Sequence, residues 1–280
     1  NQYSWTRFLR EANLLPGSDA ETETFLLKRL RTMLHINDRD RANAYLRLLA
    51  PDGPDPEKLE GDDRAYARML VLSFWGGQST VTPPDDFAAA LRLLRSYPAV
   101  RTELGQIMDY AVSSSRVIPR PTGVSLLKSH AEYSLSELVA AMEERPLPKM
   151  VSLPREGVRY FPNQNTDLFL VTLKKREDIS ASTDYHDYPV SPELMRWESQ
   201  NSTTLKSKTG QRYIHHQELG GSIAMATRFL SSNEVGTASA YTFLGKVDYV
   251  SHQGEKPIKF EWALERPMPE KLFVEGRTVA

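Results

Sequence analysis

The sequence contains no cysteine among its 280 residues. This absence excludes a disulfide scaffold, a zinc or iron–sulfur site with cysteine ligands, and catalysis by a thiol. A chain without cysteine fits a reducing compartment, so we expect the protein to be cytoplasmic.

Long apolar runs are also missing. No stretch approaches the roughly 18 apolar residues that a membrane-spanning helix needs, and the first residues do not have the pattern of a signal peptide. We therefore expect no membrane as a partner. Because the chain begins at Asn1 and its first residues already favour helix, we expect it to be a piece of a longer polypeptide.

The sequence has no excess of basic over acidic residues. The 35 Lys and Arg residues are balanced by 36 Asp and Glu residues, which leaves a formal net charge of −1. This balance excludes a polybasic protein that binds nucleic acid through bulk charge, but it does not exclude a local basic groove.

The familiar catalytic motifs are absent as well. The sequence has no Gly-x4-Gly-Lys-Ser/Thr phosphate loop, no Gly-x-Ser-x-Gly turn and no zinc-binding spacing among its six histidines. His215 and His216 are adjacent, so on a strand they would face opposite sides and could not share a metal. We expect no catalytic residue, no metal and no cofactor, and a hydrolase with an unfamiliar site is kept as an alternative.

The first part of the chain has the apolar spacing of helices. The periodic segments are residues 5–12, 25–34, 42–49, 66–74, 87–94 and 104–111. Residues 118–124 then hold two prolines and a glycine, which favour an extended connection. We predict a helical domain over residues 1–117 and a linker over residues 118–124.

The rest of the chain, residues 125–280, has mainly the alternation of strands. Residues 134–137 form a capping box that predicts the start of one helix. Residues 258–264 alternate between apolar and polar side chains, whereas residues 167–174 are apolar on both faces, as in a central strand. The predicted fold class is therefore α+β, with a helical bundle followed by a mainly antiparallel small barrel or sandwich.

Residues 183–216 combine aromatic, polar and basic side chains. An aromatic ring stacks on an exposed base for roughly 1–3 kcal/mol, an amide or carboxylate can read the base edge, and cations bind phosphate. The candidate base-binding residues are Tyr185, Asp187, Tyr188, Trp197, Gln200 and Tyr213, and the candidate phosphate-binding residues are Arg196, Lys206, Lys208 and Arg212. Hydroxyl groups and a flexible loop expected at residues 202–210 could also reach phosphates. The alternative interpretation is that the aromatic residues are a half-buried strand core and that the Ser/Thr/Lys loop is a solvated hairpin.

Four segments resemble a domain at the C-terminus of bacterial superfamily-2 helicases: NTDLFLVTLKK, YHDYPVSPELMRWESQNSTT, TGQRYIHH and YTFLGKVDYVSHQGEKPIKFEWALERPMP. Such helicases often carry a phospholipase D-like nuclease and include the SauUSI type of modification-dependent (type IV) restriction enzyme, which acts in phage defence. The resemblance is strongest over residues 125–270.

This resemblance implies a fold similar to the SRA or PUA-like β-barrel and a DNA-binding target-recognition module. Such a module flips a modified cytosine, 5-methylcytosine or 5-hydroxymethylcytosine, out of the duplex. The implied partners are double-stranded DNA with modified cytosine and the helicase and nuclease domains of the same parent chain, which would supply the catalysis. The alternative is a protein-interaction or coupling module of a helicase without modified-base specificity.

Overall fold

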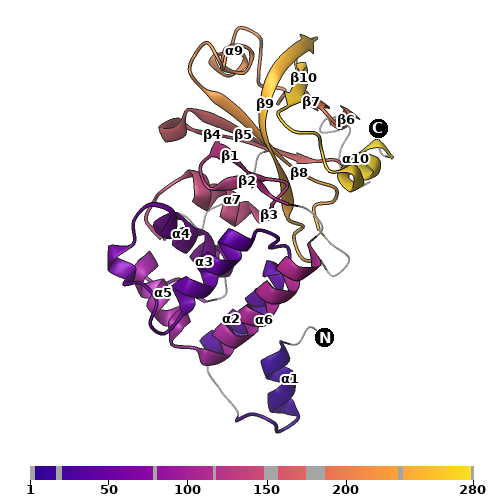
Figure 1. The fold of residues 1–280 in the computed structure, drawn as a ribbon. Helices are drawn as coiled ribbons and strands as arrows, with labels where there is room; N and C mark the ends of the chain where they lie inside the picture. The colour runs from indigo at the N-terminus through magenta and orange to yellow at the C-terminus, as the bar shows by residue number, and fades with distance from the viewer. Residues whose placement is uncertain are drawn as a thin grey trace. The chain divides into compact units, whose positions relative to one another are not determined.

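The chain divides into two compact units, one of helices and one built on a sheet (Figure 1). A computed structural model describes residues 4–16, 21–77, 81–115, 118–147, 157–174, 187–232 and 236–278. The helical unit comprises Asn1–Pro119 and Ala131–Leu153, and the sheet unit comprises Arg120–His130 and Pro154–Ala280. The predicted α+β class is confirmed, because helices precede a mainly antiparallel sheet.

Among the described residues, the helical unit contains helices at the six segments predicted over residues 5–111 and the helix predicted from the capping box at residues 134–137. Its elements are α1 (Trp5–Glu11), α2 (Glu21–Leu30), η1 (Arg31–Met33), α3 (Arg39–Leu49), η2 (Pro56–Lys58), α4 (Gly61–Trp75), α5 (Phe87–Arg95), α6 (Pro98–Ser114), the short β3 (Glu132–Tyr133) and α7 (Leu135–Met142). Helix α4 is buried almost all round from Ala65 to Trp75, so it forms the centre of this unit.

Local capping decides where several of these helices begin. Asp38 and Asp86 each accept a hydrogen bond from a backbone N–H in the first turn of α3 and α5. Ser134 and Glu137 form both bonds of the predicted capping box at the start of α7.

Helix α7 belongs to the helical unit, although the sequence pattern suggested that it opens the second domain. The Glu137 side chain is fully buried and accepts hydrogen bonds from Nη1 of Arg41 at 3.1 Å and from the Tyr45 hydroxyl at 2.8 Å. Its other oxygen lies 2.6 Å from Nε2 of His35. These contacts with the first helices tie α7 to residues almost a hundred positions earlier in the chain.

The sheet unit is built on a path of strands in the order β4-β5-β8-β9-β10-β7-β6. Its elements are β1 (Arg120–Val124), β2 (Leu127–Ser129), β4 (Val158–Phe161), η3 (Pro162–Gln164), β5 (Thr166–Thr172), β6 (Tyr188–Ser191), β7 (Leu194–Glu198), α9 (Lys208–Ile214), β8 (Ser222–Arg228), β9 (Tyr241–Gln253), β10 (Lys259–Leu264) and α10 (Glu270–Arg277). Strands β5 and β8 are parallel, and the other neighbours on this path are antiparallel.

Within the described residues this sheet is open, so the predicted SRA/PUA-like barrel is corrected to an open sheet. A barrel closes only when its first and last strands pair, and here β4 and β6 remain at opposite ends of the path.

Parts of two segments expected as irregular connections have regular structure: residues 120–124 and residues 208–210. Residues 120–124, placed in the linker by the sequence, form β1 and pair with β2 in a hairpin. In the segment 202–210, expected to be a flexible loop, Ser207 accepts a bond from Gly210 N and caps α9. His215 and His216 therefore follow a helix rather than lying on a strand.

One face of the sheet carries the core of the sheet unit. Its buried side chains include Phe169, Met225, Val247, Phe260 and Trp262. Tyr213 of α9 and Leu272 of α10 pack into the same cluster, so these helices cover this face. The opposite face of the outer strands is left for polar side chains.

Across the described residues, every helix is too short or too polar to cross a lipid bilayer.

Candidate functional site

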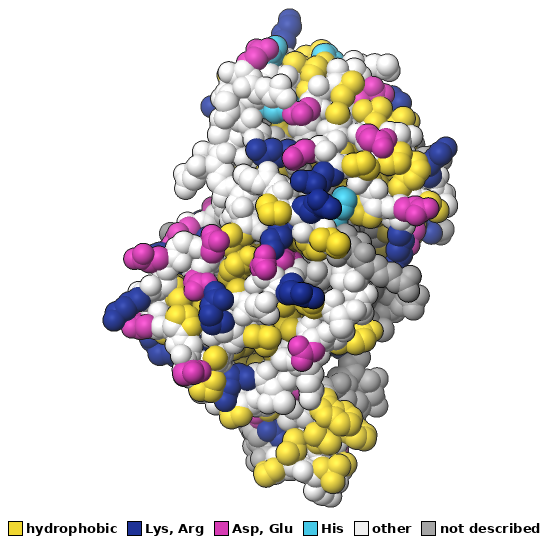
Figure 2. All heavy atoms as spheres, in the orientation of Figure 1, with side chains coloured by type: hydrophobic (Ala, Val, Ile, Leu, Met, Phe, Trp, Pro, Cys, Tyr) yellow, Lys and Arg dark blue, Asp and Glu magenta, His cyan; other side chains and the backbone are white. Residues whose placement is uncertain are grey.

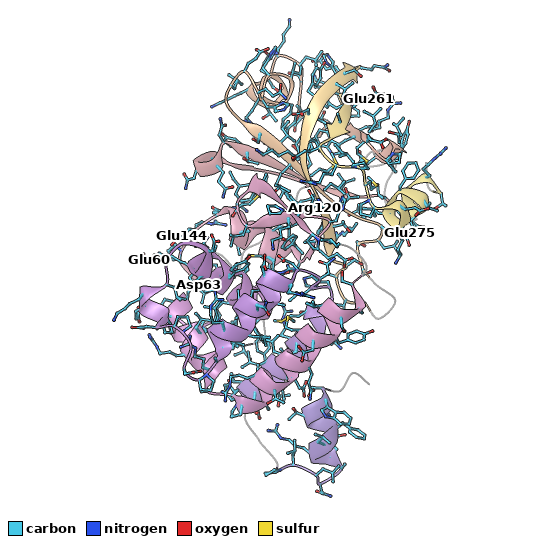
Figure 3. The ribbon with its side chains drawn as sticks, in the orientation of Figure 1. Glu60, Asp63, Arg120, Glu144, Glu261 and Glu275 are labelled. Carbon is cyan, nitrogen blue, oxygen red and sulfur yellow. The ribbon has the colours of Figure 1, made fainter. Side chains whose placement is uncertain are left out.

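Four side chains form a row across one face of the outer strands. Strands β6 and β7 pair so that Tyr188 lies opposite Arg196. Strand β10 places Glu261 opposite Arg196 on one side and opposite Ser251 of β9 on the other. Because residues directly opposite one another share a face, we call Tyr188, Arg196, Glu261 and Ser251 the open-face cluster. Figure 3 labels Glu261 on this part of the sheet.

Contacts within the open-face cluster orient its polar groups. Nη1 of Arg196 donates to the Tyr188 hydroxyl at 3.2 Å, and the guanidinium carbon lies 5.9 Å from the centroid of that ring. The Ser251 hydroxyl donates to Oε2 of Glu261 at 2.8 Å. All four side chains are half-buried. The cluster therefore presents an aromatic ring, a cation, a carboxylate and a hydroxyl on a partly accessible surface.

Two other predicted base-binding residues lie beside the ends of these strands. Oδ1 of Asp187, just before β6, accepts a hydrogen bond from the backbone N–H of Glu198 at 2.8 Å. Gln200 is half-buried just after β7. Asp187 therefore fixes the start of β6 against the end of β7. Tyr185 lies outside the described residues.

The predicted stacking role of Trp197 and Tyr213 is corrected, because both rings belong to the core. Trp197 is 4% exposed and stacks on Phe169 with ring centroids 4.1 Å apart. Tyr213 is 1% exposed and meets the same ring edge-on at 5.1 Å. Trp197 follows Arg196 on β7 and so points to the opposite face. A base has no access to either ring in this fold.

Arg212 forms an ion pair in this fold, and its phosphate-binding role stays a prediction. Its Nε and Nη2 donate to the two carboxylate oxygens of Asp167 at 2.5 and 2.8 Å. The guanidinium also lies 4.1 Å from the centroid of the Tyr160 ring. The hydrogen bonds with Asp167 raise the pKa of Arg212. This ion pair joins α9 to β5, since Arg212 lies on the helix and Asp167 on the strand. The carboxylate of Asp167 is buried, with 1% of the residue exposed.

We expect Arg212→Ala to lower the free energy of unfolding by about 2 kcal/mol, because the buried Asp167 loses both of its guanidinium donors. Lys208→Ala is the control, since it removes an exposed cation from the same helix and should change the free energy by less than about 0.5 kcal/mol. Urea titration of both variants measures the difference. Equal, small effects would contradict a stabilising role for the Asp167–Arg212 pair.

Lys206 and Lys208 remain candidates for phosphate contact. Both side chains are exposed and flank Ser207, the residue that caps α9. The backbone before them is held, because the N–H of Leu205 donates to the Glu255 carboxylate at 3.0 Å. An ordered backbone with exposed cations suits phosphate contact, since less conformational entropy is lost on binding.

Sequence reasoning missed Glu261 and Ser251 as site residues. The alternation of residues 258–264 already indicated that Glu261 faces away from Phe260 and Trp262. It did not indicate that Arg196 lies beside Glu261, because this strand pairing joins residues 65 positions apart. The predicted base-binding residues were instead all chosen from the aromatic and polar side chains of residues 183–216.

A family model described as "Domain of unknown function (DUF3427)" matches residues 127–275. No curated protein matches the chain. Among solved structures, the crystal structure of Arabidopsis thaliana SUVH6 in complex with SAM, form 2, is similar at 13% identity with a TM-score of 0.31. That match covers 83% of this chain and 40% of the SUVH6 chain. At this level of similarity it carries no information on ligand or activity.

Proposed function

The chain belongs to the DUF3427 family, and from this premise we propose that its sheet unit binds duplex DNA and recognises a modified cytosine by base flipping. In this proposal the chain is a non-catalytic target-recognition module. The helicase and nuclease domains of the same parent chain supply the chemistry, as in modification-dependent restriction.

The observation that carries the proposal is the open-face cluster. A flipped base needs an aromatic face for stacking and polar groups for its Watson–Crick edge. Tyr188 offers the ring, and Glu261 offers a carboxylate, the group that accepts from the exocyclic amine of cytosine. Arg196 adds a positive charge beside the ring, where the DNA backbone would approach.

The sequence motifs add independent support. The resemblance to helicase C-terminal domains is strongest over residues 125–270, and Tyr188 and Arg196 fall within one of its matching segments, residues 185–204. A focused site of this kind does not require a basic protein, because one flipped base is read by a few contacts. The formal net charge of −1 is thus compatible with the proposal.

We expect Tyr188→Ala to reduce the preference for a duplex with 5-methylcytosine or 5-hydroxymethylcytosine over an unmodified duplex by about tenfold. The loss corresponds to one stacking contact, worth roughly 1–3 kcal/mol. Glu261→Gln should reduce the same preference, because an amide replaces the carboxylate that accepts from cytosine. Fluorescence anisotropy with the three duplexes at about 150 mM salt measures the effect.

Tyr110→Ala is the matched control, since it removes a tyrosine that is 64% exposed on α6 and outside the open-face cluster. It should leave the preference unchanged. Equal affinity of the unaltered protein for all three duplexes would contradict modified-base recognition, and no binding to any of them would contradict DNA binding.

A second candidate function is a protein-interaction module of a helicase. The observation in its favour is the exposed apolar surface of α1, where Trp5 and Phe8 stack at 5.3 Å while 55% and 51% exposed. Figure 2 shows hydrophobic side chains gathered over this helix. Exposed aromatic pairs of this kind are typical of protein contacts. The duplex-binding measurement decides between the two functions.

A further inference from the structure

A group of cations outside the predicted site lies where the β1–β2 hairpin meets β9. The hairpin is fastened to this strand, since the N–H of His130 donates to the Phe243 carbonyl at 2.7 Å and the Ser129 hydroxyl to the Leu244 carbonyl at 3.4 Å. Strand pairing places Arg120 opposite Ser129, beside His130. The hairpin thus fixes Arg120 next to the middle of β9.

Two more basic side chains lie beside the β1–β2 hairpin, one from β9 and one from the segment after β10. A Cβ built on Gly123 would lie 3.9 Å from Nζ of Lys246, so this lysine reaches over the hairpin. The N–H of Glu265 donates to the Lys246 carbonyl at 3.2 Å, which brings the next residue, Arg266, alongside. We call Arg120, Lys246 and Arg266 the hairpin cations.

Within the described part of the chain, the charge of the hairpin cations is not neutralised by ion pairs. Among the residues that the structure describes, none is paired with Arg120, Lys246 or Arg266, and Glu265 is the acidic neighbour placed beside them. Burial lowers the pKa of His130, a hydrogen bond with the Pro267 backbone opposes this, and the positive charges of Arg266 and Arg120 lower the pKa further. The imidazole thus lies close enough to both guanidinium groups to sense their charge.

The hairpin cations lie on a surface that a long ligand can reach. Arg120 is exposed, and Lys246 and Arg266 are half-buried. Figure 3 labels Arg120, and in the same orientation Figure 2 shows Lys and Arg side chains gathered there with a histidine beside them.

The register of β9 relates the hairpin cations to the open-face cluster. Asp248 pairs with Ala263, and Ala263 shares its face of β10 with Glu261, two residues earlier. Lys246, two residues before Asp248, alternates onto that face as well. Lys246 therefore belongs to the face of the sheet that carries the open-face cluster, and Arg120 and Arg266 lie beside it.

We propose that the hairpin cations bind the phosphate backbone of duplex DNA on the face of the sheet that carries the open-face cluster. This inference rests on the proposed function. Guanidinium groups bind phosphate through paired N–H donors, and the duplex carries closely spaced negative charges that several separated cations can contact together. Phosphate contacts of this kind position the duplex without reading its sequence.

The test compares the salt dependence of duplex binding for Arg120→Ala/Arg266→Ala and the unaltered protein. Each lost phosphate contact lowers the slope of log affinity against log salt by roughly one. We therefore expect the loss of affinity between 50 and 200 mM salt to become about tenfold smaller, equally for modified and unmodified duplexes. Lys271→Ala/Arg277→Ala, which removes the same charge from α10, should keep the original slope.

Arg120→Ala alone, at an exposed side chain, provides the same test with a slope change of about one if the double variant fails to fold. An unchanged slope in a folded variant, while the unaltered protein binds DNA, overturns the inference and leaves the proposed function standing. Equal affinity of the unaltered protein for all duplexes, with the slope still lowered in the variant, supports the inference and overturns modified-base recognition. No duplex binding by the unaltered protein overturns both.

Discussion

Glu137→Gln is expected to lower the free energy of unfolding of the helical unit by about 3 kcal/mol. The variant removes the charged ion-pair partner of the Arg41 guanidinium, which is 0% exposed, and breaking a buried ion pair from one side costs about 3–5 kcal/mol. The value falls at the lower end because the amide oxygen can still accept one bond, from Arg41 or Tyr45. Urea unfolding followed by circular dichroism measures the change.

Two further variants separate the loss of the buried ion pair from the loss of a helix cap and from the loss of a carboxylate charge in general. Ser134→Ala removes the cap of α7 and is expected to cost only about 1 kcal/mol. Glu60→Gln changes an exposed carboxylate that makes no side-chain cap bond to α4 and should cost less than about 0.5 kcal/mol. Figure 3 labels Glu60. A loss in Glu137→Gln no larger than in Ser134→Ala would contradict the buried ion pair as the main contribution.

The buried ion pair of Glu137 and Arg41 also predicts that the free energy of unfolding depends on pH. Burial by itself would raise the pKa of Glu137, but Arg41 and His35 hold it well below its ordinary value. A carboxylate whose pKa is lower in the folded state stabilises fully above its unfolded pKa of about 4.3, and this contribution is lost as the pH falls below it. The stability difference between the unaltered protein and Glu137→Gln should therefore shrink from pH 7 to pH 3. A constant difference would contradict this assignment.

Trp197→Ala is expected to lower the free energy of unfolding of the sheet unit by about 4 kcal/mol. Removing a large buried aromatic side chain loses its burial and leaves a cavity, which costs about 3–5 kcal/mol. Here the indole packs between Phe169, 4.1 Å away between ring centroids, and Phe260, 6.0 Å away. Chemical denaturation measures the loss.

Trp197→Phe tests whether the ring acts through packing. It keeps an aromatic side chain in the core and should lose less than half as much stability as Trp197→Ala, with duplex preference unchanged. Trp5→Ala, at an indole that is 55% exposed, should cost less than about 0.5 kcal/mol. If Trp197→Ala instead kept its stability and lost only the preference for modified cytosine, the indole would read the base and the core assignment would be wrong.

Much of the secondary structure could be predicted because its signals are local. The capping box at Ser134 and Glu137 forms as expected, since both of its hydrogen bonds close within four residues. Alternation over residues 258–264 predicted β10, and the doubly apolar residues 167–174 predicted β5, which has neighbours on both sides. The prolines near residue 120 predicted an extended connection, whereas the hairpin of β1 and β2 accommodates Pro121 in a short two-stranded sheet.

The candidate site was predicted only in part. The sequence drew attention to Tyr188 and Arg196, which the structure brings together, and equally to Trp197 and Tyr213, which it buries. Composition cannot tell an accessible ring such as that of Tyr188 from a buried ring such as that of Trp197. Whether a ring is buried depends on which strand or helix packs against its face of the sheet.

The sequence by itself determined the helical and strand segments, the cap of α7 and the absence of cysteine chemistry, because each depends on neighbours a few residues apart or on composition alone. Only the tertiary structure decided that the sheet stays open, that Glu137 joins α7 to Arg41, and that Glu261 meets Arg196. These outcomes depend on strand register and on burial between residues far apart in the chain, where the free energy of packing the whole core selects one pairing over its competitors.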